Sequence, residues 1–403
     1  MGEASAGRSA GADDPRAVRA APSLRAFALY FLRLGATGFG GPIALAGDMQ
    51  RTLVEERGWT SPKDYLDGLA LAQLAPGPLA AQLAMYLGFT HSGLTGASVV
   101  AVAFILPSFL IVWALSAAYV RFGGLPWMRA AFYGIGAAVI AVIARSAWRL
   151  ARLTLGRDGV RWSIAVTLAV ATAYTEREIV WLFLAAGLVA MVVSPMAARA
   201  GKRAALAIPL ATALPVVPAA AAAAASSTSL LQLFLFFAKA GAFVFGSGLA
   251  IVPFLYGGVV REHGWLTDQQ FLDAVAVAMI TPGPVVITVA FIGYLVRGFG
   301  GMAAAAAGVF LPVFLFVVLP APMFRRHVDR PTLRAFVDGV TAAATGAIGG
   351  AAFVLARRAI VDGPTAGLAL AALLVLMRWR VPEPLVIAAA GLLGLLLGPG
   401  RLG

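Results

Sequence analysis

The chain has 403 residues, of which 61% are hydrophobic and 12% are charged, and its net charge is +13. An ordinary globular domain is about 45–50% apolar and about 25% charged, so this chain carries too few charges to cover a surface that faces water. It contains no cysteine, which excludes disulfides, thiolate nucleophiles and cysteine-ligated zinc or iron–sulfur centres. The composition is that of a helical protein that crosses a membrane many times.

The signatures of several other classes are missing from the sequence. There is no G-x-x-x-x-G-K-[ST] loop for the phosphates of ATP. The three histidines, His91, His263 and His327, are far apart in the sequence, so we expect no metal centre and no cofactor. The basic residues lie between apolar blocks, where they are typical of topology signals and of contact with anionic lipid rather than with nucleic acid.

Apolar blocks of about twenty residues, the length that crosses a bilayer core of about 30 Å, recur along the chain. Residues 1–23 are rich in Ala, Gly, Ser and Arg without a hydrophobic face, and they are predicted to be a disordered tail. The predicted transmembrane segments are 26–47, 65–90, 94–120, 128–148, 162–175, 178–194, 204–225, 230–256, 270–296, 299–320, 335–356, 364–378 and 384–400.

The two halves of the chain carry the same motifs at a nearly constant spacing. The first is Phe31-x-Arg33-x-Gly35-Ala36-x-x-Phe39-Gly40, which returns as Phe237-x-Lys239-x-Gly241-Ala242-x-x-Phe245-Gly246. The second is Pro76-Gly77-Pro78, which returns as Pro282-Gly283-Pro284. Both are offset by 206 positions, and after one deletion the offset is 205. Glycine and proline in fixed register indicate an internal repeat.

The repeat predicts the domain organisation. A first transmembrane repeat is expected over 24–200, a linker transmembrane segment over 201–228 and a second repeat over 229–403. Seven predicted segments separate equivalent positions of the two copies. Because an odd number of crossings ends on the opposite side of the membrane, the second copy should have the opposite orientation to the first. The fold class expected is therefore all-α and polytopic, with two inverted repeats of about six helices, a linker helix and helices broken at Gly and Pro. The excess of Lys and Arg in alternate loops predicts a cytoplasmic N-terminus.

Two bases lie inside apolar blocks at equivalent positions. Arg33 and Lys239 are each about two helical turns from the start of their block, roughly 10 Å. Such bases face a cavity or a partner, or they extend to the headgroups from near a helix end. Thr37 and Gly40 share a helical face with Arg33 through the spacing i, i+4, i+7. Because the bases recur in both halves, we interpret them as part of a substrate site.

The Gly/Pro clusters are the second candidate feature, because Pro-Gly-Pro cannot be continuous regular helix. A helix that restarts after Pro78 or Pro284 leaves free amides at its positive end, which is a site for an anion. A proline kink without a ligand is the alternative. The residues predicted to line paired substrate sites at these breaks are Gly40, Gly41, Pro76, Gly77, Pro78, Gly246, Ser247, Pro282, Gly283 and Pro284.

Acidic residues also recur in equivalent positions. Asp67 and Asp273 lie just inside their apolar blocks, and Glu56 and Glu262 lie in the loops before them. They are candidates for carrying protons or for pairing with the two intramembrane bases. An acid in a first helical turn is also an ordinary partner of the helix dipole, and this alternative stays open.

The segment from Phe31 to Pro42, followed by Gln73-Leu-Ala-Pro-Gly-Pro78, resembles the chromate ion transporter family, and Phe245-Gly-Ser-Gly248 with Thr281-Pro-Gly-Pro284 is similar to its C-terminal half. The likeness covers nearly the whole chain and is to the long members, in which two repeats are fused. It implies export of chromate across the bacterial inner membrane, driven by an ion gradient, with sulfate as a related substrate. Ser247-Gly248 replaces the Gly41-Pro42 of the first copy, so the two halves need not bind substrate alike.

Three alternatives to a chromate exporter remain at this stage. The first is a carrier of sulfate or another oxyanion, including one that works inward, and the second is an anion channel without coupling. The third is a membrane enzyme, for which the sequence offers no catalytic constellation, so no enzyme activity is expected. The expected partners are chromate, sulfate and the lipid bilayer, and a homodimer is left open.

Overall fold

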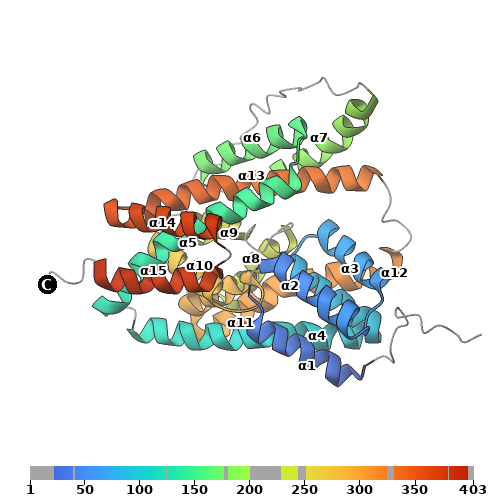
Figure 1. Ribbon diagram of the computed structural model, residues 1–403, viewed down its shortest axis with the longest axis horizontal. Coiled ribbons are helices and arrows are strands. Elements are labelled where there is room, and N and C mark those ends of the chain that lie inside the picture. The colour runs from blue at the N-terminus through green and yellow to red at the C-terminus, as the bar shows by residue number, and fades with distance from the viewer. Residues whose placement is uncertain are drawn as a thin grey trace, which may run out of the picture.

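A computed structural model of the chain describes residues 22–39, 41–122, 125–176, 180–199, 228–243, 251–324, 331–379 and 381–397. The regular elements in these ranges are helices that run mostly along the long axis of the molecule (Figure 1). The predicted N-terminal tail, apart from its last two residues, and the predicted linker segment, apart from its last residue, lie outside the described residues.

The helices of the first half run from α1 to α7. They are α1 (Leu24–Thr37), α2 (Gly41–Met49) with the π-helical η1 (Gln50–Glu56), α3 (Pro62–Leu74), α4 (Leu79–Phe122), α5 (Pro126–Thr154), α6 (Gly159–Thr175) and α7 (Val180–Arg199).

The second half repeats this order. Its elements are α8 (Leu230–Phe243), α9 (Ile251–Leu255) with the π-helical η3 (Tyr256–Glu262), α10 (Asp268–Ile280), the 3₁₀ turn η4 (Val285–Ile287), α11 (Thr288–Val318), α12 (Ala321–Phe324), α13 (Pro331–Ala359), α14 (Gly363–Arg378) and α15 (Glu383–Leu397). Even the two π-helical segments are offset by 206 positions, which confirms the internal repeat.

The first predicted segment is a helix hairpin rather than a single crossing. α1 has 14 residues, about 21 Å of helix, which is shorter than a bilayer core. α2 folds back along it, and the Tyr30 hydroxyl donates to Asp48 Oδ2 at 3.2 Å. The reversal occurs where Gly38 and Gly41 lie, and Gly41 has a φ of 76°. The Gly/Pro cluster therefore turns the chain instead of kinking it.

The second predicted segment is also a hairpin, formed by α3 and the first part of α4 (79–91). α3 begins at a Ser61 cap, whose side chain accepts from the Asp64 amide, and it ends before Pro76. A Cβ on Gly68 of α3 would overlap the ring of Tyr86 in α4, so these two helices lie side by side. The Pro-Gly-Pro sequence thus forms the turn of a hairpin that begins and ends at one side of the molecule.

α4 then reverses once more at Ser92 and Gly93, where Gly93 has a φ of 60°. The backbones of Gly88 and Gly96 touch across this turn, because neither residue has a Cβ. The second part of α4 (94–122) is 29 residues long, about 43 Å, and is long enough to cross a membrane. The break predicted between segments 65–90 and 94–120 is therefore confirmed.

The ends of these first hairpins are held together near the start of α1. His91 Nε2 lies 2.8 Å from the Pro22 carbonyl oxygen. In the second half, Arg297 Nη1 donates to the Thr228 carbonyl at 2.9 Å. Arg297 lies at the equivalent turn of α11, before Gly298 with its φ of 59°. The same local architecture thus occurs in both halves, with His91 forming the contact in the first half and Arg297 in the second.

The second-half hairpins follow the same pattern. The rings of Phe236 in α8 and Phe254 in α9 are 5.5 Å apart, so α9 folds back on α8. Tyr119 contacts both arms of the next hairpin, since it bonds Asp273 of α10 and packs on Phe291 of α11. The predicted segments 230–256 and 270–296 are therefore hairpins as well, and the thirteen predicted segments include four that do not cross as single helices.

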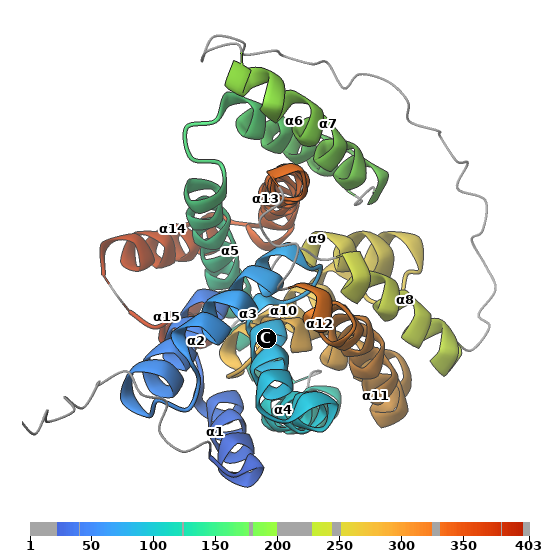
Figure 2. The same ribbon diagram turned by 90° about the vertical axis from the view of Figure 1, so that its right-hand side faces the viewer.

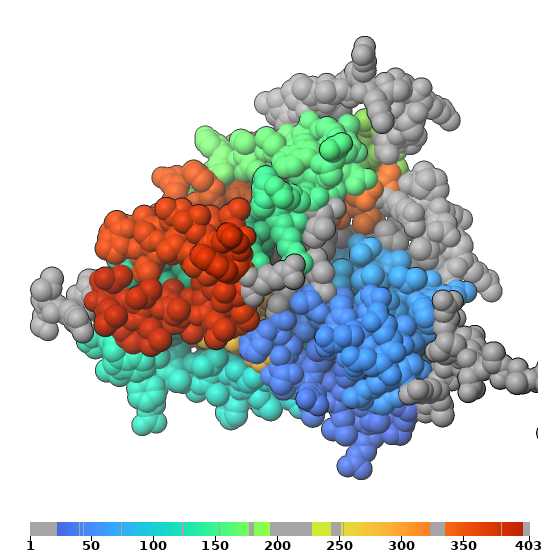
Figure 3. Space-filling model, viewed as in Figure 1, coloured from blue at the N-terminus to red at the C-terminus, as the bar shows by residue number. Residues whose placement is uncertain are grey.

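The long helices that follow the hairpins are exchanged between the halves. α5 packs on α14 and α15, whereas α13 packs on α6 and α7 (Figure 2). Small residues permit this close packing: Gly134 of α5 lies against the backbone of Ala390 in α15, and Gly346 of α13 lies against Ala165 in α6. The two repeats consequently form one interlocked body (Figure 3).

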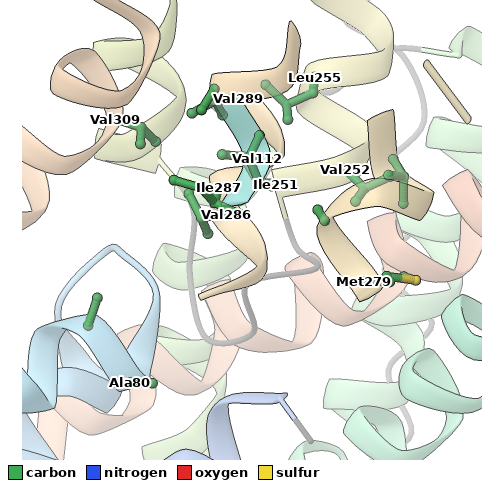
Figure 4. Packing of buried hydrophobic residues seen from close by; sticks show 14 of the residues in the cluster. Ala80, Val112, Ile251, Val252, Leu255, Met279, Val286, Ile287, Val289 and Val309 are labelled. Carbon is green, nitrogen blue, oxygen red and sulfur yellow. The ribbon is translucent and has the colours of Figure 1, made fainter. Parts of the chain in front are cut away.

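The apolar core gathers where the hairpins meet these long helices. Val112 of α4, Ile251 of α9, Ile287 of η4 and Val309 of α11 are buried together in this cluster (Figure 4). Four helices of the described part are long and apolar enough to cross a membrane, among them Pro126–Arg152 and Ala335–Ala359. With the shorter apolar helices, they make the chain a multi-pass membrane protein.

The hairpin architecture predicts which positions share one side of the membrane. Because α3 and the first part of α4 return to the side where they began, single cysteines replacing Lys63 and Thr95 should react with a membrane-impermeant maleimide from the same side. The chain has no native cysteine, so labelling in oriented vesicles reads out each site directly. Arg121→Cys, at the other end of α4, should label from the opposite side. Labelling of positions 63 and 95 from opposite sides would mean that 65–90 crosses.

Candidate functional site

Two of the hairpin turns meet in the interior of the molecule. The Gly283 amide in the second-half break (281–284) donates to the Gly38 carbonyl at the end of α1, with an N···O distance of 2.8 Å. Ser108 of α4 donates to the Pro282 carbonyl at 2.7 Å and lies 3.3 Å from the Gly35 carbonyl. A hairpin turn of one half is thus fastened to a hairpin turn of the other.

Gly283 occupies this junction because no other residue fits there. Its φ is +93°, a conformation that L side chains rarely adopt. A Cβ at this position would collide with Ser108 Oγ and lie 3.1 Å from the Gly35 carbonyl oxygen. The backbone at this Pro-Gly-Pro therefore lies close to other parts of the protein, and the amide of Gly283 is bonded by the protein itself.

The first-half break (75–78) has a different arrangement. Gly77 is buried with a φ of +137°, and a Cβ on it would lie 2.7 Å from Gln82 Nε2 and 3.1 Å from Val313 Cγ2. Gln82 is wholly buried and donates through Nε2 to the Pro76 carbonyl at 2.7 Å. Its Oε1 has no partner among the described residues. A buried acceptor without a donor indicates a place where a water or a ligand proton belongs.

The α4 helix restarts directly beside this glutamine. Within the described part of the chain, the amides of Leu79, Ala80 and Ala81 donate no hydrogen bond, whereas the Gln82 amide bonds the Pro78 carbonyl at 3.0 Å. Three free amides at a helix N-terminus carry the positive end of the helix dipole and suit an anion. The second-half break restarts as the 3₁₀ turn η4 instead, so the two breaks are chemically unequal.

The two predicted bases lie on the first helix of each half. Arg33 is exposed on α1, about 7 Å along the helix axis from Gly38, and it forms no ion pair with the described residues. The Thr37 hydroxyl donates back to the Arg33 carbonyl at 2.9 Å. Lys239 is exposed on α8, with Nζ 5.9 Å from the centroid of the Phe254 ring.

Of the remaining candidate residues, three lie outside the described part of the chain and three can be placed. Gly40, Gly246 and Ser247 lie outside the described residues, whereas Gly41 begins α2. Pro78 precedes the free amides, and the buried Pro284 precedes η4.

The four acids are distributed differently from one another. Glu56 is exposed and lies 3.4 Å from Arg51 Nε, and Glu262 is exposed at the end of η3. Asp67 is partly buried on α3. Asp273 is almost wholly buried, and its bonds are with Tyr119 and Gln269 rather than with Lys239.

A charged network lies where α10 begins. Glu176 at the end of α6 pairs with Arg261 of η3 and with Arg358 of α13, whose Nη1 also lies 2.8 Å from Asp268 Oδ2. We call these four residues the Glu176 network. It ties the second-half hairpins to the long helices at one end of the molecule.

Three polar residues near the breaks were missed by the motif comparison. Ser108, Tyr119 and Gln82 are single polar residues within apolar helix, which is the one signal that could have singled them out. Serine next to Pro107 and glutamine four residues after Pro78 are easily taken for incidental features of a long apolar run.

The junction at Gly283 should be sensitive to a single methyl group. Gly283→Ala should lower the free energy of unfolding by about 1–3 kcal/mol or more, through the strained φ alone, and contact with Ser108 adds to that loss. Thermal unfolding of the purified protein in detergent measures the effect. Gly367→Ala in α14, where a Cβ meets nothing within 4 Å, is the matched control and should be neutral or stabilising. Equal melting temperatures for the two variants would contradict the observed packing.

Comparison with known proteins places these features in a family. The family model described as chromate transporter matches twice, over residues 25–191 and 231–395. The chain is 58% identical over 387 residues, 95% of its length and 96% of the relative's, to the chromate transport protein of Cupriavidus metallidurans. It is 54% identical, over 94% of its length and 97% of the relative's, to the probable chromate transport protein of Synechococcus elongatus.

A more distant relative has the same extent. The chromate transport protein of Pseudomonas aeruginosa is 35% identical over 92% of both chains. No solved structure is similar to this chain at a significant level. The two matches coincide with the two halves of the structure, α1–α7 and α8–α15. The chain belongs to the chromate transporter family as a member with two fused repeats.

Proposed function

We propose that this protein exports chromate across the bacterial inner membrane and that the substrate is bound beside the first-half break. The names of relatives at 54–58% identity over nearly the whole chain support chromate as the transported ion. The observation that carries the location is the set of free amides at Leu79, Ala80 and Ala81 beside the unpaired Oε1 of Gln82.

The chemistry of the break suits a tetrahedral oxyanion. The amides can donate to two or three oxygens of the anion, and the helix dipole favours its negative charge. Gln82 Oε1 can accept from a water or from the proton of a hydrogenchromate ion. Because Gly77 has no side chain, the backbone can approach the ion closely. The second-half break, with its amide bonded to Gly38, is the structural partner of this site.

Arg33 and Lys239 are proposed to attract the dianion toward the breaks. An arginine about 7 Å along α1 from the junction supplies a long-range positive potential where few charges compete with it. The alternative in which these bases extend to lipid headgroups predicts no loss of transport when they are neutralised.

We further propose that the two repeats are inverted. Phe109 and Trp113 of α4 contact Phe299 at the start of the second part of α11, with ring centroids 6.1 and 5.7 Å apart. Parallel copies at one depth would instead bring Phe109 near its own equivalent, Phe314. Likewise, Thr154 at the end of α5 lies 3.1 Å from Thr345 in the middle of α13. Both contacts favour equivalent helices that run in opposite directions.

The inversion has a consequence for membrane topology. The second part of α4, α5, α6 and α7 lie between the hairpins of the two halves, and of these α4 and α5 are long and apolar enough to cross by themselves. If all four cross, the chain returns to its starting side, and the proposed inversion then requires a further crossing between α7 and α8, where the predicted linker segment, apart from its last residue, lies outside the described residues. With a cytoplasmic N-terminus, the second-half hairpins then begin outside, and the C-terminus is outside.

Transport is tested with the purified chain in liposomes. Vesicles loaded with chromate should exchange it for external radiolabelled chromate, and an imposed pH gradient should drive accumulation. Sulfate in excess should compete if the site recognises only the shape and charge of the dianion. Absence of exchange in folded protein would overturn the proposal, and exchange of sulfate without chromate would reassign the substrate.

Neutralising Arg33 tests the electrostatic part of the site. Arg33→Gln should reduce chromate exchange by at least about tenfold, which corresponds to about 1.4 kcal/mol of lost binding. Arg33→Lys should retain part of the activity because it keeps the charge. Arg25→Gln, on the exposed face near the start of the same helix, is the control and should transport normally. Normal exchange in Arg33→Gln would favour the headgroup alternative. Lys239→Gln should have the smaller effect, since the Gly283 amide of its half is bonded to Gly38 and the chain restarts there as the short 3₁₀ turn η4.

A further inference from the structure

A buried acid lies between the Glu176 network and the second-half break. Asp273 is 4% exposed and sits in α10, about 7 Å along the helix from Asp268. Its Oδ2 accepts from the Tyr119 hydroxyl at 2.6 Å, and its Oδ1 accepts from Gln269 Nε2 at 2.8 Å. An ionisable group inside a membrane protein is costly to keep and usually marks an ion or proton pathway.

The partners of Asp273 are neutral, and they can hydrogen-bond its carboxyl group in either protonation state. A tyrosine hydroxyl donates to a carboxylate and, after rotation, accepts from a carboxylic acid. The amide of Gln269 can remain on the other oxygen throughout. No cation among the described residues forms an ion pair with Asp273. The carboxyl group can therefore gain or lose a proton without the loss of its hydrogen-bond partners.

Several charged groups on the helices packed around α10 have partners of their own. Arg145 of α5 pairs with Glu383 of α15 at 3.3 Å, and Arg358 of α13 pairs with Asp268 and Glu176. Arg261 of η3 also pairs with Glu176. Other ionisable groups on these neighbours include Arg121 of α4, which lies over Phe122, Tyr133 of α5, which bonds Asp362, and Tyr294 of α11. The same elements also carry Arg129, Arg149 and Arg152 of α5, Arg297 of α11, Asp338 and Arg357 of α13, and Glu262 of η3.

Aromatic rings close the hydroxyl side of this acid. Tyr119 packs edge-on against Phe132 of α5 at 5.5 Å and against Phe291 of α11 at 5.3 Å. The acid belongs to the second repeat, whereas Tyr119 belongs to the first. Any movement of the α10 hairpin relative to α4 must therefore separate or reorient this pair.

The residues that bond Asp273 differ from those at the equivalent positions of the sequence. The position that corresponds to Gln269 is Lys63, and the one that corresponds to Tyr119 is Phe324. Asp67, the equivalent of Asp273, is thus placed four residues after a lysine, and the residue equivalent to Tyr119 is a phenylalanine. The Tyr119–Asp273–Gln269 set is therefore not repeated at the equivalent positions of the sequence.

We infer that Asp273, positioned by Tyr119 and Gln269, is a proton-binding site that couples chromate movement to the pH gradient. This inference rests on the proposed function. One proton from the side on which α10 begins binds the carboxylate when the hairpin is displaced from Tyr119. It is released on the other side after the hairpins have moved, and the chromate ion travels in the opposite direction. No covalent bond other than the O–H bond of the carboxyl group forms or breaks.

The test separates coupling from transport in liposomes that contain the full chain and trapped pyranine. Wild-type protein should show chromate exchange without a gradient, and it should show proton flux that depends on chromate. Asp273→Asn should keep exchange but lose both pH-driven accumulation and chromate-dependent proton flux, down to the level of protein-free liposomes. Asp67→Asn is the matched control at the repeat-equivalent position and should keep pH-driven accumulation.

Tyr119→Phe provides a second readout that does not require loss of the acid. Removing one hydrogen bond to the carboxylate should move the midpoint of the pH profile of chromate flux upward by about one pH unit. A purely structural role for Tyr119 would lower the amount of folded protein and leave that midpoint where it was. Asp273→Glu, which keeps the carboxyl group, should restore part of the pH-driven accumulation.

The outcomes distinguish failure of this inference from failure of the proposed function. No chromate exchange by wild-type protein would overturn the function itself. Exchange in wild type with full pH-driven accumulation in Asp273→Asn would overturn the proton site alone. If Asp273→Asn does not fold, an unchanged pH midpoint in Tyr119→Phe would overturn it equally.

Discussion

The structure depends on the need to satisfy backbone polar groups where helices are interrupted inside an apolar environment. In hydrocarbon there is no water to bond a free amide or carbonyl, so broken helices persist only where protein groups or a polar cavity receive them. Ser108 and the Gly38 carbonyl meet this need at the second-half break, since they bond the Pro282 carbonyl and the Gly283 amide. At the first-half break, the Gln82 side chain bonds the Pro76 carbonyl, and the amides of Leu79, Ala80 and Ala81 donate no hydrogen bond to the described residues.

This difference in hydrogen bonding between the two breaks explains how a duplicated fold can hold an asymmetric site. The two halves share their hairpins, their π-helical turns and the left-handed glycines at equivalent positions. They differ in the side chains that meet those elements: Ser108 in α4 corresponds to Val313 in α11, and Tyr119 corresponds to Phe324. The backbone groups at the two breaks are therefore bonded by different parts of the protein, although the breaks occupy equivalent positions. The exchange of α5 and α13 between the halves links both breaks to one body.

The sequence alone was sufficient for the class, the duplication and the family, because these depend on composition and on rare residues in fixed register. The breaks at Pro76–Pro78 and Pro282–Pro284 were also predictable, since proline cannot continue a helix. The hairpins were not, because a run of about twenty apolar residues has the same composition whether it crosses once or folds back on itself. Nor was the bond between Gly283 and Gly38, which joins residues 245 positions apart. The Asp273–Tyr119 pair connects two repeats and has no local signal.

The most direct test is the location of the substrate itself. Crystals or oriented films of the protein soaked with chromate can be examined by anomalous diffraction at the chromium absorption edge. The anomalous signal gives the position of the chromium atom directly. We predict a chromium peak beside the first-half break, with chromate oxygens within hydrogen-bond distance of the amides of Leu79, Ala80 and Ala81. A fully occupied peak remote from both breaks, for example at the Glu176 network, would contradict the proposed site.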